Sequence, residues 1–335
     1  MSRFQRLMKQ QPTELAVVEH GKIPPTTLTT IHNTAETAFH TFEENPARYQ
    51  ELVANPSKAT TNEEKVGIMA AREIFLIIDK SGSMSGSDTN PTLSNEQIKK
   101  GVSSWFGGKT SASARTHESR GLWTLWDSAR VATEAILELS LAMDKDHKID
   151  VMLFPTTNAA YGYNAQSFPV LESNNIAEVQ NLFSTNSPGG STPLAACLEN
   201  LRVQKLDALL APLKNSMNGD NIPTPFTVVI MTDGVPDNEA DVYNFFVKLV
   251  RDYELYKPGR EYIAAFTFVQ MGDNAQAAKF LEDLDDNMAN YYKRAGIGPV
   301  DIIDTKEDNF LFGTGKYEGQ AWKGPFALLH DAIFD

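Results

Sequence analysis

The chain has 335 residues, of which 41% are hydrophobic and 22% are charged, a composition typical of a globular protein and not of a disordered chain. Its 30 basic and 43 acidic side chains give a formal net charge of −13. This balance argues against a nucleic-acid surface, because binding phosphate requires clustered Lys and Arg. A single cysteine, Cys197, excludes an internal disulfide.

The N-terminal stretch carries basic residues but no continuous apolar run after them, so no secretory signal is visible. No apolar stretch approaches the roughly 20 residues needed to span a bilayer. We therefore expect a cytoplasmic protein without a membrane span.

Residues 1–70 alternate polar, Thr- and Pro-rich stretches with two short predicted helices, near residues 35–42 and 47–54. Apolar residues are too sparse here for an independent core. We predict an irregular N-terminal extension, a docking arm that packs elsewhere.

From residue 73 the pattern changes to strands that alternate with helices. The first strand, at residues 74–78, is a continuous apolar run typical of a strand buried on both faces. Residues 122–143 form an amphipathic helix. Further strands are predicted at 149–154, 166–171, 226–231, 262–269 and 300–303, and further helices at 192–213, 238–253, 275–284 and 326–334.

This alternation predicts one α/β domain over residues 71–335, with a doubly wound, mostly parallel central sheet and helices on both faces. An insertion at about residues 85–120, rich in Ser, Thr, Gly and Asn, interrupts the alternation. Its later part is locally basic and contains Trp105 and Phe106. We predict that this insertion sets the choice of partner, by offering aromatic anchors beside basic side chains.

Small oxygen-bearing residues gather in three loops. The first strand leads into Asp79, Ser81 and Ser83; another strand leads into Asp233; and Thr192 lies in a Gly-Gly-Ser-Thr-Pro loop before a helix. In open α/β sheets, ligands bind at the carboxyl ends of the strands. Carboxylates and hydroxyls without His or thiol suit Mg²⁺, Mn²⁺ or Ca²⁺ and suit zinc or copper poorly.

In order, strand context and separation, these residues resemble the metal-ion-dependent adhesion site (MIDAS) of von Willebrand factor type A (vWA) domains. The matching pattern is Asp79-x-Ser81-x-Ser83, then Thr192, then Asp233 within Thr-Asp-Gly. The resemblance extends over about residues 73–310 and implies a Rossmann-like vWA fold.

Within that family the chain is most similar to the bacterial cytosolic branch associated with tellurite resistance. The similarity lies in Leu-Ala-Met-Asp at 141–144 before Ile-Asp-Val at 149–151, and in Phe-Leu-Glu-Asp-Leu-Asp at 280–285 after Phe-Val-Gln at 268–270. The long insertion and the N-terminal arm depart from this branch.

The resemblance implies that Ser81, Ser83 and, in one state, Thr192 contact the metal directly, whereas Asp79 and Asp233 act mostly through waters. Mg²⁺ is the first choice of ion, with Mn²⁺ or Ca²⁺ as alternatives. A carboxylate from a protein partner often completes the coordination, so the bound ion is itself the adhesive group. The resemblance implies binding and not enzymatic turnover, within a stress-response or tellurite-resistance-type assembly.

Several alternatives stay open at this stage. The chain could be an adaptor for a MoxR-like AAA+ ATPase, or a structural subunit held in an assembly through residues 1–70. A metal-dependent hydrolase is disfavoured: a haloacid-dehalogenase-type phosphatase needs a second Asp two positions after the first, where this chain has Ser81. The acidic residues at 282–286 are predicted to form a solvated cluster at a helix end, with an accessory cation site as the alternative.

Overall fold

The computed structural model describes residues 25–86, 124–143, 148–155, 168, 170–215, 223–312 and 324–334. Most of the insertion predicted at about 85–120, including Trp105 and Phe106, lies outside these residues. Its role in partner choice stays a prediction.

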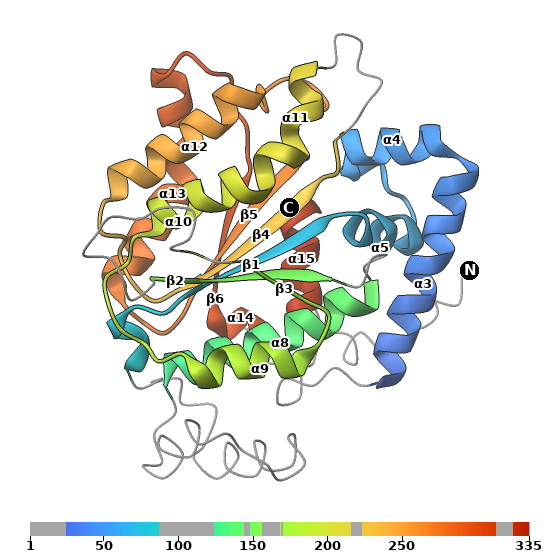
Figure 1. The fold of residues 1–335 in the computed structure, drawn as a ribbon. Coiled ribbons are helices and arrows are strands. Elements are labelled where there is room, and N and C mark those ends of the chain that lie inside the picture. The colour runs from blue at the N-terminus through green and yellow to red at the C-terminus, as the bar shows by residue number, and fades with distance from the viewer. Residues whose placement is uncertain are drawn as a thin grey trace.

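A six-stranded sheet forms the centre of the molecule, in the order β3-β2-β1-β4-β5-β6 (Figure 1). Every neighbouring pair is parallel except β2 and β3, which are antiparallel. The predicted fold class, α/β with a mostly parallel sheet, is confirmed. The strands are β1 (Glu73–Asp79), β2 (Ile149–Phe154), β3 (Val170–Ser173), β4 (Phe226–Thr232), β5 (Ala264–Gln270) and β6 (Ile303–Glu307).

The order of the strands creates a topological switch point between β1 and β4. From β1 the chain moves outward through β2 and β3, and it then returns to place β4 on the opposite side of β1. This is the Rossmann strand order, in which ligands bind at the carboxyl ends of the two strands where the winding reverses. Because Ile78 pairs with Met231, the ends of β1 and β4 lie level with each other.

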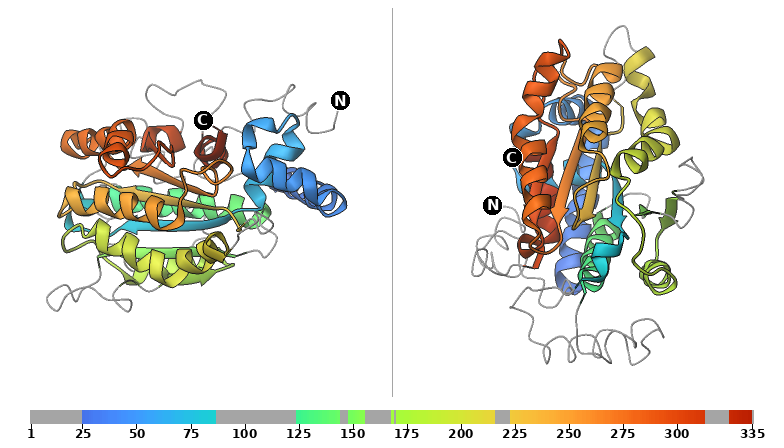
Figure 2. Two further views of the ribbon diagram at one scale, coloured as in Figure 1. Left: turned by 90° about the horizontal axis from the view of Figure 1, so that it is seen from above. Right: turned by 90° about the vertical axis from the view of Figure 1, so that its left-hand side faces the viewer.

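Helices cover both faces of the sheet, as predicted (Figure 2). On one face Leu76 and Ile78 of β1 join a core with α8 (Leu125–Met143), α9 (Ile176–Thr185), α14 (Asp308–Phe312) and α15 (Pro325–Phe334). On the other face Phe75 and Ile77 join a second core. Its helices are α10 (Leu194–Leu201), α11 (Asp207–Asn215), α12 (Glu239–Tyr253) and α13 (Ala275–Arg294).

Some elements differ from the sequence-based prediction. The helix predicted over 192–213 is α10, a π-helical turn η5 (Arg202–Leu206) and α11. Helix α13 continues to Arg294, so the acidic residues at 282–286 lie inside a helix and not at its end. The last strand was predicted at 300–303 from its apolar residues, but it is β6 at Ile303–Glu307. An edge strand is only partly buried, so an apolar run does not mark its position.

The N-terminal region is more regular than the predicted irregular arm. It forms α3 (Pro25–Glu44), α4 (Pro46–Ala54), the 3₁₀ turn η2 (Pro56–Lys58), α5 (Asn62–Ala70) and the link to β1 (Figure 1). Its apolar side chains, among them Ile31, Ala35 and Phe42, are buried in the same core as α8 and α15. These helices therefore extend the main core and do not build one of their own.

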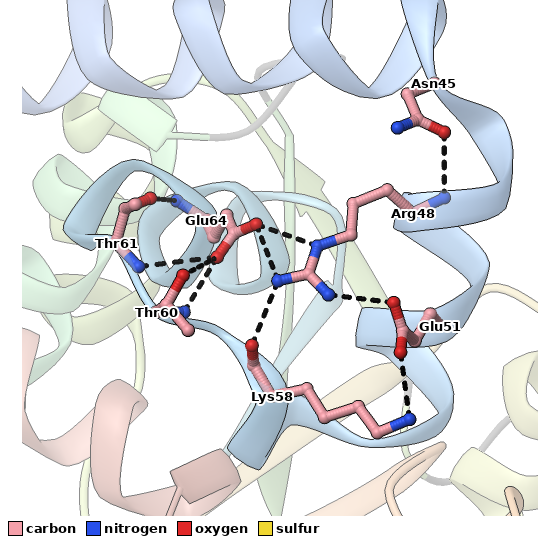
Figure 3. A network of polar contacts seen from close by, with 7 residues as sticks. All are labelled: Asn45, Arg48, Glu51, Lys58, Thr60, Thr61 and Glu64. Carbon is pink, nitrogen blue, oxygen red and sulfur yellow. Dashed lines mark hydrogen bonds and ion pairs between the residues drawn. The ribbon is translucent and has the colours of Figure 1, made fainter.

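A polar network joins α4 to α5 (Figure 3). The Arg48 guanidinium donates from Nε to Glu64 Oε1 at 2.9 Å and from Nη1 to Glu51 Oε2 at 2.8 Å. Glu64 also closes a capping box with Thr61 at the start of α5. Partly exposed ion pairs contribute little to the free energy of unfolding. The main effect of this network is therefore to set the orientation of α4 relative to α5.

Arg72 ties this region to the sheet. Its side chain is buried, and its guanidinium donates to Thr227 Oγ1 at 2.8 Å and to the carbonyl oxygens of Phe226 and Tyr262. Burial lowers the Arg72 pKa to about 9. The start of β1 is thereby connected to the start of β4 and of β5.

Substitution of Gly67 tests how closely α3 and α5 pack against each other. Ala normally stabilises a helix interior relative to Gly by about 1 kcal/mol. A Cβ at Gly67, however, would lie 2.6 Å from Ala38 Cβ and 2.7 Å from Phe42 Cε2. We expect Gly67→Ala to lower the free energy of unfolding by about 1–3 kcal/mol in urea titrations. A gain in stability, as helix propensity alone predicts, would contradict this packing.

Candidate metal centre

All five predicted site residues belong to loops at or next to the switch point. Asp79 is the last residue of β1, and Ser81 and Ser83 follow in the turn that enters the 3₁₀ helix η3 (Gly82–Ser85). Asp233 comes directly after β4, and Thr192 precedes α10. Hydrogen bonds and close contacts link these residues through three separate loops.

Asp79 is held from two sides. Its side chain is fully buried, with 0% exposed, and Oδ1 accepts the backbone N–H of Ser81 at 2.7 Å. Oδ2 accepts the hydroxyl of Thr232, the last residue of β4, at 2.7 Å. The carboxylate thus joins the ends of the two central strands.

A chain of hydroxyls connects the first loop to Asp233. Ser81 Oγ and Ser83 Oγ lie 3.0 Å apart, and Ser83 Oγ donates to Asp233 Oδ1 at 2.8 Å. Ser81 and Asp233 are buried, whereas Ser83 is exposed. The network therefore reaches from the protein interior to the surface, where an ion or a partner can approach.

Thr192 lies against the same network. A Cβ built on Gly234 would be 3.3 Å from Thr192 Oγ1 and 3.7 Å from Ser83 Oγ, so both hydroxyls face the small space beside Gly234. The backbone N–H of Thr192 donates to Asp237 Oδ1 at 2.8 Å, and its carbonyl accepts the N–H of Asp237 at 2.9 Å. The loop after β4 thus fixes Thr192 from its backbone.

Backbone contacts hold the Thr192 loop against the Asp79 loop. The N–H of Gly189 donates to Lys80 O at 2.7 Å, and the N–H of Gly82 donates to Gly190 O at 3.1 Å. Gly190 has φ +96°, and a Cβ there would lie 2.8 Å from Pro155 Cγ. Glycine is required at this position both by its backbone conformation and by this close approach.

The two carboxylates carry an electrostatic cost. Burial raises the pKa of Asp79 to about 7, and the charge of Asp233 adds to the rise. Burial also raises the pKa of Asp233. Two buried carboxylates this close favour a positive charge between or beside them, because a cation offsets both the desolvation and the mutual repulsion.

The donor set fits a hard divalent cation. The atoms on offer are carboxylate oxygens of Asp79 and Asp233 and hydroxyl oxygens of Ser81, Ser83 and Thr192, the ligand type that Mg²⁺, Mn²⁺ and Ca²⁺ prefer. In the part of the chain that the structure describes, no three His, Cys, Asp or Glu side chains gather as a metal-binding group. The candidate centre agrees with this, since it has only two carboxylates and otherwise uses hydroxyls.

The sequence analysis did not assign a role to two residues of the site. Thr232 belongs to the Thr-Asp-Gly motif, and its role, to supply the hydroxyl that holds Asp79, is seen only in the structure. Asp237 positions Thr192 across 45 residues of sequence, a contact with no local signal.

The structure also places Cys197 and the acidic residues of α13. Cys197 is fully buried, and burial, together with the charge of Asp79, raises the pKa of its thiol. It is a small residue of the core. In the acidic cluster of α13, Asp283 accepts the hydroxyl of Tyr243 at 2.6 Å, and Asp285 accepts the hydroxyl of Thr305 at 2.9 Å. These two acids hold neighbouring elements and are not merely solvated.

Among the described residues, no helix is both long enough and apolar enough to cross a membrane.

No protein-family model and no curated protein matches the chain. Among solved structures, the crystal structure of the manganese-loaded Plasmodium vivax TRAP protein matches with a TM-score of 0.32 and 14% sequence identity, over 73% of this chain and 72% of that chain. A likeness of this size is too low to indicate a shared family or function, so the site must be interpreted from its own geometry.

Substitutions at the adjacent Gly189 and Gly190 test how closely the Thr192 loop packs against its neighbours. We expect Gly190→Ala to lower the free energy of unfolding by about 1–3 kcal/mol, because the positive φ becomes strained and the new Cβ meets Pro155. Gly189→Ala is the matched control, since a Cβ at Gly189 has no atom within 4 Å. Chemical denaturation compares the two. Equal stability of both variants would contradict the loop geometry.

Proposed function

We propose that this chain is a vWA-type binding protein that holds a divalent cation at the switch point and uses it to capture a carboxylate of a protein partner. Ser81, Ser83 and Thr192 would supply hydroxyl oxygens to the ion, and Asp79 and Asp233 would supply negative charge around it. The bound ion would supply the electrophile that an acidic side chain of the partner binds.

One observation carries this proposal: the five residues meet at the switch point of the sheet. Asp79 ends β1, Asp233 directly follows β4, and a continuous hydrogen-bond network runs through Ser81 and Ser83 between them. Burial raises the pKa of both carboxyl groups at this ligand-binding edge of the sheet, and a bound cation would offset that cost.

The chemistry of the ligands favours adhesion through the ion. The sequence resemblance implies that the two carboxylates act mostly through waters, so the direct protein ligands of the ion would be neutral hydroxyls and the ion would keep its attraction for an external anion. Ser83 is exposed and gives a partner access to that ion. An external carboxylate is the group that best completes such a site. We therefore expect the partner to contribute an acidic side chain.

We propose binding and not catalysis as the activity. The hydrogen bonds that Asp79 and Asp233 accept come from two hydroxyls and a backbone amide, and none of these three donors is a general base. The single buried thiol of Cys197 is compatible with the cytoplasm. A stress-response or tellurite-resistance-type assembly is the setting that the sequence resemblance suggests.

Metal titration tests the ion site. Isothermal titration calorimetry with Mg²⁺ and Mn²⁺ should give one saturable site in the wild-type chain. Asp79→Asn should weaken it by about 10- to 100-fold, because a neighbouring charged group is lost while the shape is kept. The control is Asp252→Asn, an exposed aspartate on α12 with the same change in charge. Equal affinity in all three proteins would contradict the proposed centre.

Partner capture tests the second step separately. Immobilised wild-type chain should retain a partner from extract in Mg²⁺ and release it in EDTA, and Asp79→Asn should retain none in either condition. Retention that is the same with Mg²⁺, with EDTA and in Asp79→Asn would exclude adhesion through the ion, even where the ion itself binds.

A further inference from the structure

A second candidate site lies far from the metal centre along the strands. A cavity of about 530 Å³ is lined by the first residues of two strands, Ala264 of β5 and Ile303 of β6, and by the end of α15 at Asp331 (β5, β6 and α15 in Figure 1). The metal centre is at the opposite, carboxyl ends of the strands. The volume is in the range of pockets that bind small organic molecules, about 300–1,000 Å³.

The lining of this cavity is strongly acidic. It includes five carboxylates and no Lys, Arg or His, and all of its residues belong to the described part of the chain. Asp301 is exposed, and the other four are half-buried. The five are Glu261, Asp285, Asp301, Asp304 and Asp331.

The protein offsets only part of this charge. Asp304 pairs with Lys306 at 3.0 Å, and Asp331 lies 3.1 Å from His330 Nδ1. Asp285 accepts the backbone N–H and the hydroxyl of Thr305, at 3.1 and 2.9 Å, and burial raises its pKa. These two donors are neutral, so the charge of Asp285 is held in place without being cancelled.

Glu261 is held in a similar way. Its Oε2 accepts the backbone N–H of Arg260 at 2.9 Å, and Glu261 forms no ion pair within the described residues. Glu261 precedes β5, whereas Asp285 lies on α13, so two elements each place an uncompensated carboxylate at the cavity.

The arrangement distinguishes between kinds of cation. A bare metal ion needs several oxygens that converge on one point, yet among the described residues no three acidic side chains do so. The rest of the lining is apolar or aromatic, with Tyr256, Tyr262 and Val300 among its residues. Such walls suit methylene groups, and aromatic faces attract ammonium groups.

We propose that this cavity binds a linear organic polyamine, with ammonium groups at the separated carboxylates and methylene segments against the apolar and aromatic walls. Its two main anchors are Glu261 and Asp285. Each ammonium then replaces water with a charge-assisted hydrogen bond, and the spacing between the carboxylates selects a chain with more than one amino group.

Calorimetric titration of spermidine into the full chain, at about 0.15 M salt, tests this directly. We expect one saturable site, and we expect Glu261→Gln and Asp285→Asn each to weaken it about tenfold. Both changes keep the shape of the side chain, and circular dichroism checks that each variant is folded. Propylamine, with a single amino group, should bind about tenfold more weakly than spermidine.

Two controls separate this site from general attraction to a chain of net charge −13. Asp286→Asn makes the same change in charge one residue along α13, outside the cavity lining, and should leave spermidine affinity unchanged. Asp79→Asn, at the metal centre, should also leave it unchanged. The proposal is overturned if spermidine shows no saturable binding, if Asp286→Asn weakens it as much as Asp285→Asn, or if propylamine binds equally well.

Discussion

The reversal of winding between β1 and β4 is the constraint on which the rest of the molecule depends. Helix α8, which lies between β1 and β2 in the chain, and helix α12, which follows β4, pack on opposite faces of the sheet, and ligands bind at the carboxyl ends of two strands that are wound in this way. The sequence places Asp79 and Thr232 at those ends, and one hydrogen bond of 2.7 Å joins them. A fully buried carboxylate is tolerable only with such partners, and the loops that carry Ser81 and Thr192 are arranged around it.

The two ends of the sheet have different structural roles. At the starting end, the buried Arg72 and helices α3–α5 fasten the strands together and complete the apolar core. At the carboxyl end, backbone contacts between the Gly189–Gly190 segment and the Asp79 loop hold small polar side chains in place. The site residues lie on short loops, and the rigid strands and helices hold these loops in place. In this way a site can be preorganised for an ion.

The central strands and the position of the candidate site were predictable from the sequence. The elements and contacts that were not predictable were missed for physical reasons. Apolar runs predicted β1 and β4, and the polar residues directly after them predicted the site. The helices of residues 25–70 were underestimated because their apolar side chains, such as Ile31 and Phe42, pack on a core supplied by distant elements. Strand β6, with the sequence Ile-Asp-Thr-Lys-Glu, is defined by its pairing with β5 and not by its composition. The contact of Asp237 with Thr192 likewise depends on tertiary structure alone.

A crystal structure of the chain grown with Mn²⁺, with anomalous diffraction measured at the manganese edge, tests the central claim most directly. The account predicts one anomalous peak at the carboxyl ends of β1 and β4, within coordination distance of the Ser81 and Ser83 hydroxyls. Intact loops with no peak there, or a peak only at another place on the chain, would contradict it.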